Sequence, residues 1–124
     1  MAKVRDVIKK HGVEVLFNDS VGDGWSDILD RLFTDLIEMG WAKRGFQIKE
    51  KFASLTFYAD YSGISDIDTA RKRVDAARAE SSKTCELCGE PGFPMRGSMG
   101  WWKTLCEDHH AEREAVYTSS LDVV

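Results

Sequence analysis

The chain has 124 residues, of which 43% are hydrophobic and 31% charged, and its formal net charge is −4. This length allows one domain with a modest core, and this composition excludes an intrinsically disordered chain. No apolar run approaches the roughly 18 residues of a membrane span, and no apolar signal segment follows the charged N-terminus, so we expect a reducing cytoplasmic environment.

The first strong signal along the chain is a helix that begins near Asp23. A short amphipathic stretch over residues 3–11 comes before it, and Val13, Val15 and Phe17 then alternate briefly. From Trp25 to Ile37 the apolar residues recur at helical spacing, which predicts a helix with one face on a core. We expect Asp23 to be its N-cap and Gly40 to end it.

Residues 46–52 and 55–61 both have strand composition and predict an antiparallel hairpin. Only Ala53 and Ser54 intervene, and neither favours the positive φ of two-residue hairpin turns, so a longer turn is expected. Ser65 to Asp68 then resembles a capping box. It predicts a helix to about residue 82 that packs on the hairpin through small residues, with Ile67, Ala70, Val74 and Ala77 on its apolar side.

The C-terminal third contains two pairs of residues with the spacing of zinc ligands. Cys85 and Cys88, followed by Gly89, predict a zinc knuckle, and Cys106 with His109 predicts a second pair on the first turn of a helix. An odd number of cysteines argues against a disulfide framework. His110 is an alternative to His109, although the C-x₂-H spacing favours His109.

Four protein ligands fill a tetrahedral site and leave no position for water, so we expect one structural Zn²⁺ per chain. The segment between the two pairs predicts a hairpin, because turn-forming glycine and proline residues occur at 91–94 and 96–100. Residues 101–105 are its expected return strand. Knuckle, hairpin and helix follow the order of a treble-clef finger. The predicted fold is therefore α+β, with a helix and hairpin core over residues 1–84 and a zinc module over residues 85–124, packed as one domain.

The zinc module is acidic and rich in large apolar residues. Residues 85–124 carry three basic and seven acidic side chains, a balance that suits a phosphate backbone poorly. Within it, Glu86 and Asp108 are interpreted as solvated rather than catalytic. Alternation along a strand predicts that Trp101 and Trp102 face opposite sides, one in the core and one exposed as an anchor for a partner. The alternative, which the sequence favours equally, is that both tryptophans cover a small core.

Three segments together resemble a group of small proteins of tailed phages and prophages. They are the Gly-Asp-Gly-Trp helix start at residues 22–25, the hairpin Ile48 to Tyr58 of the "KEKFGGLRFY" type, and the zinc segments 84–92 and 100–109. The resemblance covers residues 22 to 110 and departs at Ala53 and Ser54, where the group has two glycines. It implies a phage origin and the same zinc ligands, and it implies no activity.

We expect a non-enzymatic protein that binds a host or phage protein in the host cytoplasm and inhibits a host enzyme or defence nuclease, as anti-CRISPR proteins do. The acidic surface would then occupy a basic nucleic-acid channel. The alternative is nucleic-acid binding through Arg71, Lys72, Arg73 and Arg78, although acidic residues interleave with them. A third hypothesis, an HNH-like nuclease, would need a catalytic histidine besides the zinc segment, and His11 is the one further histidine.

Overall fold

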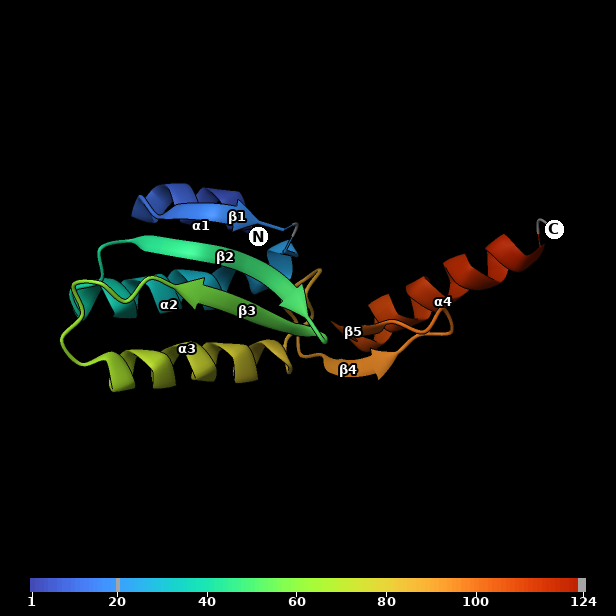
Figure 1. The fold of residues 1–124 in the computed structure, drawn as a ribbon. Helices are drawn as coiled ribbons and strands as arrows, with labels where there is room; N and C mark the ends of the chain where they lie inside the picture. Colours follow the sequence, from blue (N-terminus) through green and yellow to red (C-terminus); the bar gives the residue numbers. More distant parts are fainter. Residues whose placement is uncertain (20, 123–124) are drawn as a thin grey trace.

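The computed structural model describes residues 1–19 and 21–122, with side chains described as far as Val116. A three-stranded sheet and the first three α-helices form one end of the molecule, and the C-terminal hairpin and last helix form the other (Figure 1). The predicted α+β class is confirmed. In chain order the elements are α1 (Val4–His11), β1 (Glu14–Asn18), η1 (Asp23–Trp25), α2 (Ser26–Glu38), β2 (Arg44–Lys51), β3 (Ser54–Ala59), α3 (Ile67–Ser81), β4 (Phe93–Arg96), β5 (Trp102–Leu105) and α4 (Glu107–Asp122).

Helix α2 carries the apolar stripe that its sequence predicts. Its inward side chains, all buried, are Ile28, Leu29, Leu32, Phe33 and Leu36. The ring of Phe33 lies 5.6 Å from that of Trp41 and 5.6 Å from that of Phe57, which joins the helix to the sheet. The helix ends where predicted, because Gly40 adopts a φ of +94° and the N–H of Trp41 turns back to the carbonyl of Leu36 at 3.0 Å.

The prediction that Asp23 caps α2 is wrong. Asp23 begins the short 3₁₀ turn η1, and the position before α2 is occupied by Trp25. The Oδ1 atom of Asp23 instead accepts a 2.9 Å hydrogen bond from the backbone N–H of Val4, the first residue of α1. The carboxylate therefore satisfies a free N–H group at the start of a different helix, which a pattern of local spacing does not reveal.

The predicted hairpin is present and forms part of a three-stranded sheet. β2 and β3 pair antiparallel, and β1 pairs parallel with β2 on its other side, so the strand order is β1-β2-β3. Val13 is buried and Val15 half-buried, whereas Phe17 is exposed, so the brief alternation noted in the sequence does not end in the core. Parallel pairing joins strands that are distant along the chain, and such pairing has no local sequence signature.

The turn between β2 and β3 is shorter than expected. It consists of Phe52 and Ala53, whose φ angles are +51° and +62°, while Ser54 already pairs with Lys51. Positive φ at both central residues is the requirement of a tight hairpin turn. Ala53 is buried in this turn, and its carbonyl accepts a 2.6 Å hydrogen bond from Thr104 of β5. A tertiary contact thus accompanies a conformation that neither side chain favours.

Helix α3 begins one residue later than the capping-box pattern indicates. Asp66 is the N-cap, and its carboxylate accepts hydrogen bonds from the backbone N–H and the hydroxyl of Thr69. The helix packs against α2 and β3 through its small residues, of which Ala70 and Ala77 are fully buried. Ile67, expected on the apolar side, is exposed.

The C-terminal segment has the predicted treble-clef order. A Cys-containing loop follows α3, the antiparallel pair β4 and β5 comes next, and α4 begins directly after Cys106. Glu107 and Asp108 occupy the first turn of α4, where carboxylates oppose the positive end of the helix dipole. Among the described residues, no helix combines the length and apolar character that crossing a membrane requires.

Candidate metal centre

The four residues that the sequence predicts as zinc ligands lie together between the knuckle loop and α4. Cys85 and Cys88 come from the loop after α3, Cys106 from the position between β5 and α4, and His109 from the first turn of α4. One ligand atom of each lies within 4.8 Å of the others. The folded chain therefore brings together two pairs of residues that are separated by the 17 residues 89–105.

The spacing of these atoms fits a single tetrahedral ion. The Sγ atoms of Cys88 and Cys106 are 3.9 Å apart, and the Nδ1 atom of His109 lies 3.4 Å from Sγ of Cys85 and 3.1 Å from Sγ of Cys106. Zinc bonds of about 2.3 Å to sulfur and 2.0 Å to nitrogen imply edges of about 3.8 and 3.5 Å in a tetrahedron. A disulfide, with sulfurs about 2.05 Å apart, does not match the Cys88–Cys106 separation.

A tight turn of the backbone brings the two knuckle cysteines to one point. Gly89 has a φ of +80°, and its N–H donates a 2.9 Å hydrogen bond to the carbonyl of Cys85. The N–H of Cys85 in turn donates to the carbonyl of Glu90 at 2.8 Å, which closes the loop. Glycine reaches this left-handed region without the cost that a side chain would add. The Cys-x-x-Cys-Gly pattern is therefore a geometric requirement of the loop.

The electrostatics of the cluster favour a cation. Burial raises the pKa of the Cys85 thiol, but hydrogen bonds from the backbone of Cys106, Cys88 and Leu87 outweigh this effect and bring that pKa down to about 7. Burial, together with the neighbouring sulfurs of Cys85 and Cys106, raises the pKa of Cys88 to about 11. Adjacent thiolates repel one another, so a divalent ion is needed to hold all of them ionised.

The two neighbouring histidines have different surroundings. His109 presents Nδ1 to the sulfurs, and its Nε2 lies 3.9 Å from the carboxylate of Glu112 one turn along α4. His110 is buried, bonds through Nε2 to the carbonyl of Phe93 at 2.8 Å, and packs on the Phe93 ring with centroids 4.6 Å apart. The geometry therefore favours His109 as the metal ligand and gives His110 a packing role between α4 and β4.

The interpretation of Glu86 as a solvated loop residue is wrong. It is only 4% exposed, and its carboxylate pairs with the ammonium group of Lys103 on β5 at 3.0 Å. Burial raises the pKa of Glu86, and Lys103 partly opposes that rise. Asp108, in contrast, is exposed as expected. This ion pair between a buried carboxylate and a half-exposed ammonium group joins the knuckle loop to the strand that leads to Cys106.

Backbone contacts join the metal-binding loop to the start of α2. The N–H of Gly24 donates to the carbonyl of Glu86 at 2.9 Å, and the indole N–H of Trp25 donates to the carbonyl of Thr84 at 2.8 Å. A Cβ atom on Gly22 would lie 2.1 Å from the Glu86 oxygen, and one on Gly24 would lie 2.1 Å from the Cys85 oxygen. The two glycines thus allow the close approach of the loop, a role that the sequence interpretation missed.

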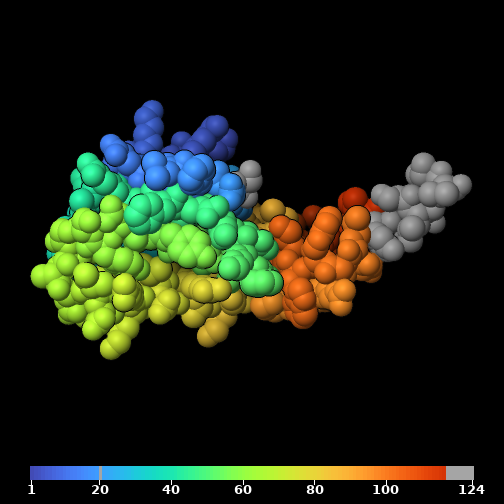
Figure 2. Space-filling model, viewed as in Figure 1, coloured from blue at the N-terminus to red at the C-terminus, as the bar shows by residue number. Residues whose placement is uncertain are grey.

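Trp101 and Trp102 do not divide between core and surface as predicted. They are 68% and 52% exposed, and β5 begins only at Trp102, so Trp101 precedes the alternating part of the strand. Phe52, at the tip of the β2–β3 turn, is 80% exposed. The hairpin meets the C-terminal module in the view of Figure 2. Phe52, Trp101 and Trp102 line one hollow between these two parts.

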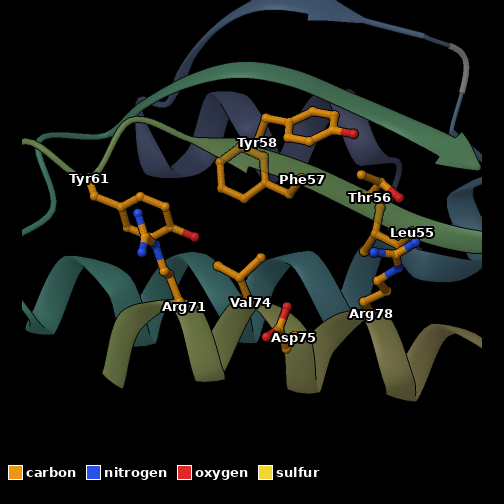
Figure 3. Close-up of a pocket in the computed structure, with 9 residues that line it drawn as sticks. All are labelled: Leu55, Thr56, Phe57, Tyr58, Tyr61, Arg71, Val74, Asp75 and Arg78. Carbon is orange, nitrogen blue, oxygen red and sulfur yellow. The ribbon is translucent and has the colours of Figure 1, made fainter. Parts of the chain in front are cut away.

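The residues behind the other two hypotheses have internal partners. His11 lies on α1, where its Nε2 atom contacts Asp30 at 2.5 Å and its ring packs on Phe33. On α3, Arg73 pairs with Asp35 at 2.5 Å. Arg71 lies over the ring of Tyr61, 5.6 Å from its centroid, beside a hollow of ≈ 250 Å³ between β3 and α3 (Figure 3). Arg78 donates a 3.4 Å hydrogen bond to the hydroxyl of Ser54. His11 is thus outside the Cys₃His cluster, and three of the four α3 arginine and lysine residues already contact the protein itself.

Comparison of the chain with protein-family models, with curated proteins and with solved structures found no match. A Cys₃His set at tetrahedral spacing is a possible metal-binding group, and soft thiolate and imidazole ligands are those that zinc favours.

Proposed function

We propose that the chain binds one structural zinc ion through Cys85, Cys88, Cys106 and His109. The observation that carries this proposal is that all four ligand atoms already lie at the spacing of one tetrahedral ion. When bound, the ion neutralises the thiolates and crosslinks the knuckle loop, β5 and α4. With four protein ligands there is no position for a substrate, so the role of the metal is to stabilise the fold.

Metal analysis of the purified full-length chain tests this proposal. About one zinc per chain is expected, with the loss of stoichiometric zinc in Cys106→Ser. Glu90→Gln is a suitable control, because Glu90 is an exposed residue in the same loop whose contact with Cys85 uses its backbone. A chain that copurifies with substoichiometric zinc and gains no folding stability when zinc is added would contradict the proposal.

We further propose that the protein acts by binding another protein, without catalysis of its own. Exposed tryptophans are the side chains most enriched at binding hot spots, and here two of them belong to a rigid, metal-crosslinked module. The acidic balance of residues 85–124 suits a basic surface, such as the nucleic-acid channel of a host enzyme or defence nuclease. A phage protein in the host cytoplasm would inhibit such an enzyme stoichiometrically.

Affinity purification of the tagged full-length chain from the bacterial host tests this second proposal. One host protein is expected to be enriched with the zinc-loaded chain and lost with the Trp101→Ala, Trp102→Ala double variant. Phe17→Ala is the matched control, because Phe17 is also exposed but lies on β1, outside the C-terminal module. Binding of a DNA or RNA oligonucleotide that weakens steeply with salt would instead favour the nucleic-acid alternative.

A further inference from the structure

A single hollow lies where the tip of the first hairpin meets the zinc module. Its volume is ≈ 590 Å³, and it is lined by Glu50, Phe52, Gly100, Trp101, Trp102 and Lys103. Three exposed aromatic side chains and one carboxylate therefore surround the same space. Neither Phe52 nor Glu50 belongs to the sequence segment that contains the tryptophans, so the fold alone creates this arrangement.

The two-residue turn requires a positive φ at position 52, but it does not require an aromatic residue there. An aromatic residue at a φ of +51° is strained by roughly 1–2 kcal/mol, because its Cβ crowds the following carbonyl oxygen. Folding recovers little of this cost by burying the ring, since the side chain is 80% exposed. A strained and exposed aromatic residue is typical of a functional position.

The walls of the hollow are held in place before any partner arrives. The carbonyl of Trp101 accepts hydrogen bonds from the N–H of Gly97, at 2.9 Å, and from the guanidinium of Arg113 on α4. The hydrogen bond from Thr104 to Ala53 attaches β5 directly to the turn that carries Phe52. Preorganised walls reduce the entropy that binding would otherwise cost.

The hollow offers a cation one carboxylate, that of Glu50, and three aromatic rings. The ammonium group of Lys103 is already paired with the buried Glu86, whereas no ion pair to Glu50 is found among the described residues. Aromatic faces attract cations through their quadrupole. The Phe52 ring already has such a contact within the chain, because the ammonium group of Lys51 lies 5.7 Å from its centroid, and a cation from a partner would therefore share or replace it.

We propose that this hollow receives an arginine or lysine side chain from a basic segment of the partner protein. The cation lies among Phe52, Trp101 and Trp102, and the carboxylate of Glu50 is its counter-ion. The inference names the chemistry of the binding surface and depends on the proposed protein-binding function for the identity of the partner. The cation site can be tested without the partner protein, because the hollow should bind a small cationic peptide by itself.

Titration of the zinc-loaded full-length chain with two synthetic peptides tests this inference. One is acetyl-Gly-Arg-Gly-Arg-Gly-amide, and the other replaces each arginine by citrulline, which keeps the shape and removes the charge. Saturable changes in tryptophan fluorescence and in the indole N–H resonances of Trp101 and Trp102 are expected with the arginine peptide. Affinity for the citrulline peptide should be at least about fivefold weaker, the effect expected of a cation–π contact.

Three variants locate the binding. Glu50→Gln, Trp101→Leu and Phe52→Asn should each weaken binding of the arginine peptide about fivefold, while Phe17→Ala should leave it unchanged. Asparagine suits Phe52 because it tolerates positive φ and therefore preserves the turn. Zinc content and circular dichroism equal to those of the wild type show that each variant is folded.

Equal affinity for the two peptides, or an unchanged affinity in all three variants, would overturn the inference. Tighter binding of a dT10 oligonucleotide than of the arginine peptide would also overturn it and would point to base stacking. The two proposals fail separately. A host protein that is captured equally by wild type and Glu50→Gln, with no peptide binding, leaves the protein-binding function intact and removes the cation site.

Discussion

The backbone N–H of Gly24 donates a 2.9 Å hydrogen bond to the carbonyl oxygen of Glu86, which lies between two of the predicted metal ligands. This contact joins the first turn of the α2 region to the knuckle loop. The indole of Trp25 supports it by donating to Thr84, immediately before Cys85. The metal centre is therefore attached to the hydrophobic core through the backbone of the loop that supplies its ligands.

Gly24→Ala should destabilise the zinc-loaded protein by about 1–3 kcal/mol, because the new methyl group would lie 2.1 Å from the carbonyl oxygen of Cys85. Urea denaturation followed by circular dichroism measures the effect. Gly12→Ala is the matched control, since a Cβ there meets nothing within 4 Å and only its φ of +66° is unfavourable. A loss for Gly24→Ala no larger than that for Gly12→Ala would show that the loop does not depend on this close approach.

Removal of zinc by a chelator should unfold the C-terminal module and loosen the start of α2. The cause is the repulsion and desolvation of the three clustered cysteines once the cation is gone. The amide of Gly24 donates to the carbonyl of Glu86, and the amide of Glu86 donates to the carbonyl of Thr104. In hydrogen-exchange measurements these two amides should lose protection, while the amides in the middle of α2 keep theirs. Addition of zinc should restore protection and magnesium should not, since magnesium prefers oxygen ligands. Unchanged protection at Gly24 would separate the metal site from the core.

His109→Ala should lower zinc affinity strongly, whereas His110→Ala should lower folding stability and change zinc affinity little. Loss of the His109 ligand should weaken zinc binding by more than the 10–100-fold typical of outer-shell partners, as measured by competition with a colorimetric chelator. His110→Ala should keep zinc affinity within a few-fold of the wild type and lower stability by about 1–3 kcal/mol, because it removes the buried bond to Phe93. The reverse result would identify His110 as the ligand.

Asp23→Ala should destabilise the protein by about 1 kcal/mol through the loss of an acceptor for the first N–H of α1. Asp23→Asn keeps a side-chain oxygen at the same position and should retain most of the stability. Thermal unfolding of the two variants at the same zinc concentration makes the comparison. If the two substitutions are equally harmful, the negative charge of Asp23 matters more than its hydrogen bond.

The sequence predicts the parts of this protein that depend on neighbouring residues. The helical spacing from Trp25 to Ile37 predicts α2, the glycine at position 40 predicts its end, and the Cys-x-x-Cys and Cys-x-x-His spacings predict which side chains come together. Each of these signals is local, since helix periodicity and paired ligands span only a few residues. Signals of this kind can therefore be recognised before the tertiary structure is known.

Other features depend on contacts between residues that are distant along the chain, and only the tertiary structure decides them. Asp23 is adjacent to α2 but bonds to α1, and Glu86 resembles a surface residue but is buried and pairs with the half-exposed Lys103. The same is true of the turn at Phe52 and Ala53, where positive φ occurs together with the hydrogen bond from Thr104. The free energy of such long-range contacts exceeds the weak local preferences of single residues, so the sequence determines the metal ligands and the fold determines what surrounds them.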